Sequence, residues 1–458
     1  MDDKQYKKII IRIKDLAKIK FINDTLVLQL GAVVNIVLGF AATIAIVRTL
    51  HIQDYGVYAL ILSVYGCINF FGNFSIDKVT VIKLAEARLK KDQQQINNIL
   101  AAYTKLAFIL SVSVCVIGFI FSPYLAQVLY GRKDIGDLAR VIFLAAPFGV
   151  FYELICVIFH GFRMIKHLAI VESIFRACKT LFILIVLILG FGLFGIITAL
   201  AINSLICSVI AILIYKKLQL KEEKMPHLGK ILRMVRGASV VKYLKFSLWM
   251  TLDKSLFNLY DILPIIILGR FVNYAEVGYF KIAKDLIAYF VYLFWPIYRG
   301  LLVKFPSVLA QKGKLYAYNF FVKVSLFSGM VASGIAFVLL FAVPFIITYS
   351  YGNEYAPANG VVTVLLFYLI FSGFNVAIPA LYEILRQVKL LVYIKLLAIV
   401  FILPFGLLLI KAKGIVGAAL FCNGMILVAS VLAFSFAIYI LRNVKQRNNF
   451  YGLLSRDI

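Results

Sequence analysis

Residues 48–56 read RTLHIQDYG, and residues 270–278 read RFVNYAEVG. Both stretches follow the pattern Arg-x5-acid-x-Gly, and they begin 222 positions apart. Each stands at the end of a long apolar run, where a membrane-spanning helix would leave the bilayer. A recurrence at so wide a spacing is the first sign that the chain contains two copies of one unit.

Two more patterns recur at nearly the same spacing. Pro-x7-Gly at 123–131 returns at 344–352, and Gly-x-x-Gly at 192–195 returns at 414–417. Each match alone is weak, but three matches in the same order indicate duplication of a six-helix unit. Because six is even, both copies have the same orientation, and we expect a pseudo-two-fold axis along the membrane normal.

The composition is typical of a polytopic membrane protein. The 458 residues are 63% hydrophobic and 15% charged, with a mean hydropathy of +0.96. A soluble domain with this composition would expose large apolar patches, whereas a run of about 20 apolar residues can cross the hydrocarbon layer. The predicted spans are 24–47, 55–76, 98–121, 137–158, 167–189, 193–215, 246–269, 277–298, 316–343, 359–381, 389–410 and 414–441.

These observations predict the fold class. The chain is expected to be all-α, with about twelve transmembrane helices in two pseudo-symmetric six-helix lobes around a central cavity. The expected parts are an amphipathic cytoplasmic segment, an N-terminal lobe, a basic cytoplasmic linker, a C-terminal lobe and a cytoplasmic tail. Their respective boundaries are 1–22, 23–215, 216–245, 246–441 and 442–458.

The net charge of +27 comes from 48 Lys and Arg against 21 Asp and Glu. Nucleic-acid-binding proteins also have such a balance, but here the cations lie mostly in short loops between apolar runs. The loops on the N-terminal side hold most of them, which places both termini and 216–245 in the cytoplasm. We therefore expect a multi-pass protein of the bacterial cytoplasmic (inner) membrane, with no nucleic-acid partner.

The sequence lacks the motifs of several enzyme classes. It has no GxxxxGK[ST] phosphate loop and no HExxH, and its six cysteines form no CxxC pair. The pattern GxGxxG occurs at 190–195, but between two apolar spans it predicts a tight helix–helix turn. We expect no enzyme activity, no cofactor and no metal ion.

Charged residues inside the predicted spans are the candidates for function, since each costs about 2.5–3.5 kcal/mol at mid-bilayer. In the fifth span, Glu172, Arg176 and Lys179 share one helix face through their i, i+4, i+7 spacing. One carboxylate cannot neutralise both cations, so this face is net positive. It either lines a cavity or forms a structural ion network with a neighbouring helix.

Asp261 lies deep in the seventh span, one turn before Pro264, where a carboxylate suits H⁺ or Na⁺ coupling. The alternative is a salt bridge to a lysine of the eighth span. Near the start of that span, the i, i+4 spacing favours a pair between Lys281 and Asp285. Lys284 is then left for another partner.

Arg48 and Arg270 occupy equivalent positions of the two copies, at outer helix ends. They either face the pathway or pair with Asp54 and Glu276, which would join each helix to its hairpin partner. Lys395, in the inner half of the eleventh span, is expected to extend toward the headgroups.

The predicted membrane interior carries more Lys and Arg than Asp and Glu. A cationic cavity suits an anionic substrate, such as a lipid-linked diphosphate or an acidic sugar, and suits a cationic drug poorly. Some tyrosines could stack on sugar rings, although anchoring at the interfaces explains most of them. The tyrosines in question are Tyr58, Tyr65, Tyr260, Tyr279 and Tyr289.

The stretch RTLHIQDYGVYAL at 48–60, with VN at 34–35 and GF at 39–40 before it, resembles the start of bacterial polysaccharide flippases. These are the O-antigen and capsule repeat-unit flippases of the multidrug/oligosaccharidyl-lipid/polysaccharide flippase superfamily. The second copy, at 270–283, is similar to the same family. Through the twelve-span, two-lobe plan, the resemblance covers essentially the whole chain.

The resemblance implies movement of undecaprenyl-diphosphate-linked oligosaccharide from the inner to the outer leaflet, coupled to an H⁺ or Na⁺ gradient. It implies that helices one, two, seven and eight line the cavity, which favours Arg48, Asp261, Lys281 and Lys284. The implied partners are the lipid bilayer, a polysaccharide polymerase and a chain-length regulator. We assign substrate binding to Arg48, Arg176, Lys179, Arg270, Lys281 and Lys284, and ion coupling to Asp261, Glu172 and Asp285.

Two other functions stay open. A drug/cation antiporter of the same fold would need an acidic cavity, which the excess of cations opposes. A membrane polysaccharide polymerase would need a substantial outer catalytic loop, and the predicted outer loops are short.

Overall fold

The computed structural model describes residues 30–70, 72, 76–220 and 225–443. The predicted amphipathic segment 1–22 lies outside the described residues, as does nearly all of the predicted tail 442–458. The described chain consists of helices joined by short turns, and no strand occurs among its described residues.

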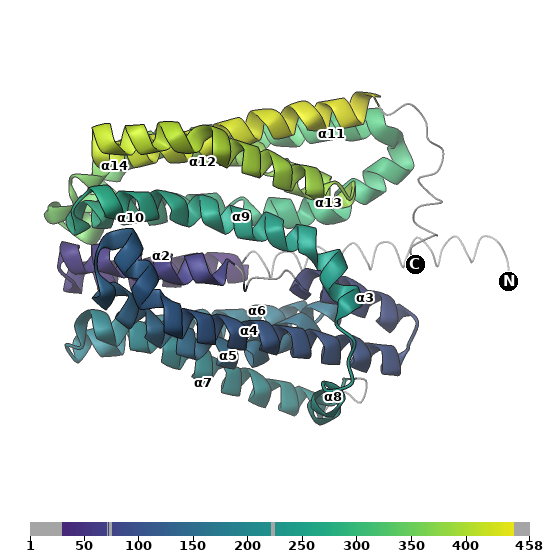
Figure 1. Ribbon diagram of the computed structural model, residues 1–458. Helices are drawn as coiled ribbons and strands as arrows, with labels where there is room; N and C mark the ends of the chain where they lie inside the picture. Colours follow the sequence, from purple (N-terminus) through teal and green to yellow (C-terminus); the bar gives the residue numbers. More distant parts are fainter. Residues whose placement is uncertain (1–29, 71, 73–75, 221–224, 444–458) are drawn as a thin grey trace.

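The first described helix, Leu30–Thr49, is followed by the helices labelled in Figure 1. They are α2 (Ile52–Asn69), α3 (Ile76–Leu89), α4 (Gln93–Tyr130), α5 (Lys133–Gly161), α6 (Ile165–Ile188), α7 (Gly192–Gln219), α8 (Leu228–Met234), α9 (Val241–Phe271), α10 (Tyr274–Tyr292), α11 (Trp295–Ile346), α12 (Ala358–Asn375), α13 (Ala377–Ile384) and α14 (Val388–Asn443).

Two of these elements, α11 and α14, are each a pair of antiparallel helices. Each bends at one glycine, where φ is 77° in α11 and 53° in α14. In α11, the ring centroids of Phe305 and Phe320 lie 5.2 Å apart, and in α14 a Cβ on Gly406 would touch the ring of Phe421. In a straight helix, residues fifteen positions apart are separated by roughly 22 Å, so both elements must turn back on themselves.

Eight described helices are long and apolar enough to cross a membrane. α2, α6 and α9 run through the bundle beside them but are too polar or too highly charged to meet that criterion. The stretch Val388–Leu441 counts once among the eight although it contains two antiparallel helices. With these additions the described residues hold twelve spans, which confirms the prediction of about twelve.

The helices form two lobes (Figure 1). The N-terminal lobe contains Leu30–Thr49 and α2 to α7, and the C-terminal lobe contains α9 to α14. α2 packs against both α9 and α10, so these helices form the centre of the interface between the lobes. The predicted all-α, two-lobe fold class is therefore confirmed.

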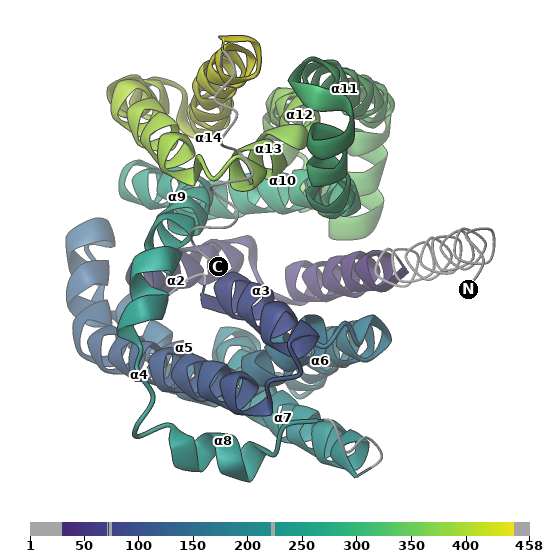
Figure 2. The ribbon, with the colours of Figure 1, turned by 90° about the vertical axis from the view of Figure 1, so that its right-hand side faces the viewer.

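The two ends of the bundle differ in their loops. We call the end with α3, α8 and α13 the basic end, because the Lys- and Arg-rich segments 76–92, 216–220 and 225–240 lie there. It is at the right in Figure 1 and faces the viewer in Figure 2. The other end, which holds the turn between Leu30–Thr49 and α2, is called the opposite end.

One pair of equivalent glycines in the recurring patterns has nearly the same φ in the two copies. Gly192 and Gly414 each stand at a turn, with φ of 54° and 53°. Glycine adopts positive φ without the clash that costs other residues about 1–2 kcal/mol. The first of these turns belongs to the GxGxxG stretch 190–195, which joins α6 to α7 as predicted.

A second pair of equivalent glycines brings the lobes into close contact. A Cβ on Gly56 would lie 1.8 Å from the Tyr274 carbonyl oxygen, and one on Gly278 would lie 2.8 Å from the Ile52 carbonyl oxygen. Ile52 and Tyr274 are the first residues of α2 and α10. The contact is thus reciprocal, as expected where two copies meet at a pseudo-two-fold axis.

The linker between the lobes is attached to the N-terminal lobe. The Lys105 ammonium of α4 donates to the carbonyl oxygens of Arg236 (3.0 Å) and Ala238 (3.1 Å). The Tyr215 hydroxyl of α7 donates to the Pro226 carbonyl oxygen over 2.7 Å. These contacts fix α8 and its flanking residues to the N-terminal lobe.

Two segments outside the predicted spans are largely helical. The sequence analysis leaves 77–97 and 299–315 as loops, but α3 covers most of the first and α11 most of the second. Both segments are too polar to be recognised by hydropathy. α3 nevertheless buries Val79 and Leu84, and the first half of α11 buries Leu301 and Phe305.

Candidate functional site

A cavity of about 340 Å³ lies between the two lobes. Its lining comes from Leu30–Thr49, α2 and α6 of the N-terminal lobe and from α9, α10, α12 and α14 of the C-terminal lobe. The structure brings six of the nine predicted site residues together in this lining. They are Arg176, Lys179, Asp261, Lys281, Lys284 and Asp285.

Two of the four cations in the cavity are paired with carboxylates. The Lys284 ammonium lies 2.9 Å from a carboxylate oxygen of Asp261, and Lys281 forms an ion pair with Asp285 on the next turn of α10. The Lys284 side chain is 12% exposed, whereas that of Asp261 is 65% exposed although α9 lies inside the bundle. Asp261 therefore faces open space in the cavity, where water can solvate it.

The other two cations are on α6. Within the described part of the chain, neither Arg176 nor Lys179 forms an ion pair. Their i, i+3 spacing places them on neighbouring turns of the same helix face. The lining thus carries two more cations than carboxylates, and the excess charge is on the N-terminal lobe.

The uncharged part of the lining is rich in tyrosine. The Tyr289 hydroxyl lies 2.8 Å from the Thr43 hydroxyl, across the two lobes, and the Tyr55 hydroxyl donates to Asp285 over 3.2 Å. Flat rings beside cations can hold a sugar face while the charges hold an anion. The lining tyrosines are Tyr55, Tyr58, Tyr260, Tyr289, Tyr292 and Tyr368.

Three predicted site residues do not line the cavity. Arg48 is exposed and donates to the Ser350 carbonyl oxygen over 2.8 Å and to the Tyr349 carbonyl oxygen. Arg270 is exposed at the end of α9, and Glu172 is half-buried on α6, nearer the basic end. Their assignment to the pathway stays a prediction.

The alternative prediction, that each arginine pairs with the acid of its own motif, also differs from the structure. Among the described residues, Arg48 forms no ion pair with Asp54, and Arg270 forms none with Glu276. Glu276 instead accepts a bond from the Asn273 side chain over 3.1 Å, at the start of α10. Arg48 instead reaches across the lobes to carbonyl oxygens of 347–351, the turn directly after α11.

Several lining residues are absent from the sequence-based set. Tyr292, Tyr368, Asn258 and Cys422 line the cavity, and Tyr368 belongs to an almost wholly apolar helix, α12. None of these side chains is charged. They could be identified from the sequence only if the face that each helix turns toward the cavity were known. Of the five tyrosines considered, Tyr65 and Tyr279 lie outside the lining. Tyr65 packs on Phe143, and Tyr279 packs on Tyr355.

The opposite end of the cavity is closed by tight packing between lobes. The Gly56 contact with the Tyr274 backbone lies there, and the buried Tyr355 hydroxyl donates to the Val47 carbonyl oxygen over 3.0 Å. The bonds from Arg48 to backbone carbonyl oxygens of the C-terminal lobe add to this closure.

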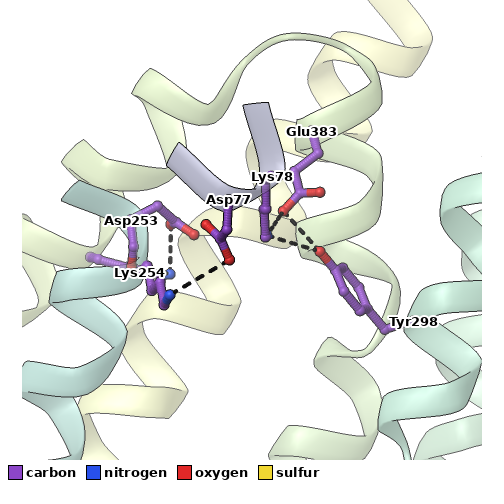
Figure 3. Close-up of polar contacts among 7 residues, drawn as sticks. Asp77, Lys78, Asp253, Lys254, Tyr298 and Glu383 are labelled. Carbon is purple, nitrogen blue, oxygen red and sulfur yellow. Dashed lines mark hydrogen bonds and ion pairs between the residues drawn. The ribbon is translucent and has the colours of Figure 1, made fainter. Parts of the chain in front are cut away.

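At the basic end, the lobes are joined by ion pairs (Figure 3). Lys78 of α3 lies 2.9 Å from a carboxylate oxygen of Glu383 of α13, which also accepts a 2.9 Å bond from the Tyr298 hydroxyl of α11. Asp77 of α3 lies 4.0 Å from the Lys254 ammonium of α9. Partial burial lowers the pKa of Lys78, but Tyr298 and Glu383 outweigh it and raise the pKa above its ordinary value.

Lys395 departs from the prediction that it extends to the headgroups. Its ammonium lies 2.6 Å from a carboxylate oxygen of Asp253, within the C-terminal lobe. The lysine on α14 thus pairs with a carboxylate on α9 instead of reaching the headgroups. The apolar sequence around Lys395 gives no indication of this partner.

Comparison with known proteins places this geometry in a family. The family model described as polysaccharide biosynthesis protein matches residues 21–303. A search of curated proteins found no match to the chain.

Three solved structures illustrate the fold that the chain shares. A multidrug resistance MATE family transporter of the MOP superfamily in an inward-facing conformation is 14% identical, with a TM-score of 0.76 over 90% of this chain and 96% of that one. Such a transporter in an outward-facing conformation is 14% identical, with a TM-score of 0.65 over 91% and 94%.

A MOP superfamily transporter from Pyrococcus furiosus, described as having a binding pocket of reverse polarity, is 13% identical. Its TM-score is 0.66, over 91% of this chain and 94% of that one. At these identities the likeness establishes the fold. That fold is the multi-pass, two-lobe fold of membrane transporters. Because the family model matches more than half of its length, the chain belongs to the polysaccharide biosynthesis protein family.

Proposed function

We propose that this protein is a flippase for undecaprenyl-diphosphate-linked oligosaccharide repeat units. It moves them from the inner to the outer leaflet of the bacterial inner membrane by alternating access of its two lobes. The observation that carries the proposal is the pair Arg176 and Lys179, two cations of the cavity lining without an ion-pair partner among the described residues. They supply a site for the diphosphate or for an acidic sugar.

The arrangement of the cavity supports a substrate with both charged and sugar parts. Cations on α6 hold the anion, and tyrosines from both lobes offer flat surfaces to sugar rings. No covalent bond changes in this process. The polyprenyl tail stays in the bilayer while the headgroup crosses, so the cavity holds only the polar part of the substrate.

The orientation of the protein is part of the proposal. The Lys- and Arg-rich loops support an orientation with the basic end, and with it both termini, in the cytoplasm. Close packing at the opposite end then corresponds to a state closed to the outside. The higher TM-score against the inward-facing than the outward-facing transporter supports this assignment.

Ion coupling is proposed for Asp261 and Asp285, with Glu172 as a further carboxylate outside the cavity lining. Each of the first two is paired with a lysine of α10. Binding of H⁺ or Na⁺ to either carboxylate weakens its lysine pair and frees the ammonium for the substrate. A polysaccharide polymerase and a chain-length regulator are the proposed partners that use the transported unit.

The function is tested by deleting the gene and measuring surface polysaccharide together with the leaflet position of the lipid-linked precursor. Loss of surface polymer with intact precursor on the cytoplasmic leaflet is the expected result. Normal polymer with changed drug sensitivity would contradict the flippase function and indicate a drug/cation antiporter. Repeat units that reach the outer leaflet but stay unpolymerised would indicate a polymerase.

A further inference from the structure

Two of the ion pairs drawn in Figure 3, Lys78–Glu383 and Asp77–Lys254, join the lobes at the basic end. On α9, Phe257 lines the cavity and Lys254 is three residues nearer the basic end. Each helical residue advances the chain by about 1.5 Å, so Lys254 lies about 5 Å along the helix from that part of the lining. The pair that contains Lys254 therefore lies close to the side of the cavity that faces the basic end.

The pairs cross from one lobe to the other. Asp77 and Lys78 are neighbours on α3 of the N-terminal lobe, and their partners Lys254 and Glu383 come from α9 and α13 of the C-terminal lobe. Each lobe contributes one cation and one anion. The contact is electrically neutral while the lobes are together, and it leaves four uncompensated charges when they separate.

The two ends of the cavity are closed by interactions of different strength. The side chains of Asp77, Lys78 and Lys254 are 43–44% exposed and that of Glu383 is 15% exposed, so water weakens the attraction within both pairs. The opposite end is closed by backbone packing at Gly56, where not even a Cβ would fit. The basic end therefore opens more easily.

We propose that the pairs Lys78–Glu383 and Asp77–Lys254 form an ionic latch over the cavity, opened by the anionic headgroup of the substrate. The headgroup binds Lys78 and Lys254 in place of their carboxylates, and the lobes then lose the attraction that holds this end closed. This inference rests on the proposed function, because it takes the substrate to carry a diphosphate or an acidic sugar.

The charges of the cavity complete the entry path. A diphosphate offers several oxygen acceptors and a charge that matches two ammonium groups, so it competes well with single carboxylates. Beyond the latch lie Arg176 and Lys179, for which the structure provides no carboxylate partner among the described residues. The headgroup therefore moves from lysines that have partners to cations that have none.

The latch is tested by measuring access to the cavity. In a chain whose six cysteines are replaced by serine, Phe257→Cys places a thiol in the cavity lining. The rate at which a membrane-impermeant maleimide labels this thiol is measured in inside-out membrane vesicles, where the cytoplasmic side faces the reagent. Size-exclusion chromatography checks each variant for folding first.

Charge reversal of the latch is expected to speed labelling. Lys78→Glu or Glu383→Lys turns attraction into repulsion, and loss of a pair worth about 1 kcal/mol raises the open population about fivefold. The double variant Lys78→Glu/Glu383→Lys re-forms the pair with its signs exchanged and should restore the slow rate. A double variant that labels as fast as the single variants would overturn the latch.

A matched control tests whether any lost ion pair has the same effect. Arg140 and Asp137 form a comparably exposed pair within α5 of the N-terminal lobe. Arg140→Glu should leave the labelling rate unchanged. An equal acceleration by this variant would mean that the latch pair has no special role.

Inorganic diphosphate serves as the probe for opening by an anion. At millimolar concentration it should speed labelling of the chain with an intact latch more than chloride at equal ionic strength does, because chloride only screens charge. It should have a smaller effect on Lys78→Glu. Equal effects of diphosphate and chloride would overturn opening by the headgroup.

The test separates failure of the latch from failure of the flippase function. Labelling reports on cavity access whether or not anything is transported. Suppose that labelling responds to the charge swap and to diphosphate, but deletion of the gene leaves surface polysaccharide unchanged. The latch would then be supported and the flippase function would not. Loss of polysaccharide on deletion, with labelling indifferent to the swap, would leave the flippase and remove the latch.

Discussion

At the scale of residues, the cations of the cavity are of two kinds. Lys281 and Lys284 have carboxylate partners on α10 and α9, whereas Arg176 and Lys179 on α6 have none among the described residues. A paired lysine holds neighbouring helices together, and an unpaired cation attracts an anionic ligand. Substitutions at the two kinds of site should therefore have different effects.

Removing the unpaired charges should abolish transport without unfolding the protein. The double variant Arg176→Gln/Lys179→Gln deletes the two cations of α6 that line the cavity and breaks no ion pair among the described residues. We expect surface polysaccharide to fall at least about tenfold, since a charge-assisted bond contributes about 1.5–3 kcal/mol. Expression and thermal stability should be unchanged.

Lys133→Gln/Arg140→Gln is the matched control for this prediction. It removes two cations that lie outside the cavity lining. Surface polysaccharide should be normal in this variant. Equal loss of polysaccharide in both double variants would indicate a general effect of net charge rather than a binding site.

Breaking the pair between Asp261 and Lys284 should affect stability asymmetrically. Asp261→Asn leaves the mostly buried Lys284 ammonium without a carboxylate, which should cost about 1–3 kcal/mol because the exposure of Asp261 weakens the pair. Lys284→Met should cost less, because water in the cavity can solvate Asp261. Thermal unfolding in detergent, with Asp261→Asn/Lys284→Met as the compensated variant, measures the difference. Equal shifts in the two single variants would contradict it.

These charged pairs can be predicted from the sequence more readily than the aromatic residues of the cavity lining can. Spacing alone favours the pair of Lys281 with Asp285, and the partner that this leaves for Lys284 is Asp261. In contrast, Arg48 bonds to backbone carbonyl oxygens, which no pattern of side chains can reveal. Tyr368 faces the cavity only because of the rotation of α12, which depends on packing throughout the C-terminal lobe.

At the scale of elements, α2 and α10 depend on glycine where they cross. Gly56→Ala places a methyl group 1.8 Å from the Tyr274 carbonyl oxygen, so the two helices must move apart. We expect a loss of about 1–3 kcal/mol, as for other overpacked sites, and impaired transport. Thermal unfolding and the yield of folded protein measure the effect.

Gly229→Ala in α8 is the control for that substitution. Nothing lies near its Cβ position, and alanine favours a helix over glycine by about 1 kcal/mol. This variant should be as stable as the parent or slightly more so. Full stability of Gly56→Ala would mean that the crossing is looser than the structure indicates.

Hydropathy predicts most helices of this chain because lipid-facing surface must be apolar along a whole span. It fails for α3 and for the first half of α11, which continue beyond the apolar runs at the basic end. Their stability comes from buried positions such as Val79 and Phe305, separated by polar residues. A window that averages over a span cannot detect this.

At the scale of the whole molecule, alternating access requires the opposite end to open. Arg48→Cys and Ser350→Cys, joined by a short bifunctional maleimide, would fix the lobes together where Arg48 now bonds to the Ser350 backbone. Transport should stop in the cross-linked protein and remain in the unlinked double variant. Leaflet translocation of the lipid-linked precursor in vesicles measures this.

The control is a cross-link within one lobe. Arg140 donates to the Phe119 carbonyl oxygen over 2.8 Å, and both residues belong to the N-terminal lobe. Phe119→Cys/Arg140→Cys, joined by the same reagent, should leave transport intact. Transport that survives the cross-link between lobes would rule out rocking of the lobes as the mechanism.

The two-lobe plan is the part of the molecule that the sequence predicts most directly. Three patterns at one spacing suffice, because the two copies place the same glycines at the same turns, as at Gly192 and Gly414. The latch at the basic end has no such counterpart. Its partners Lys78 and Glu383 are 305 positions apart and are brought together only by the folded lobes.

The charges of α6 also affect how the protein is made. A helix that carries Glu172, Arg176 and Lys179 is a poor substrate for the translocon, since each cation at its centre adds about 2.5–3.5 kcal/mol to the free energy of insertion. The tight turn at 190–192 joins it to α7, which packs against it and carries charges only in its last turn. During biosynthesis α6 should therefore enter the membrane together with α7, as a hairpin, and a chain truncated between them should leave α6 outside the bilayer.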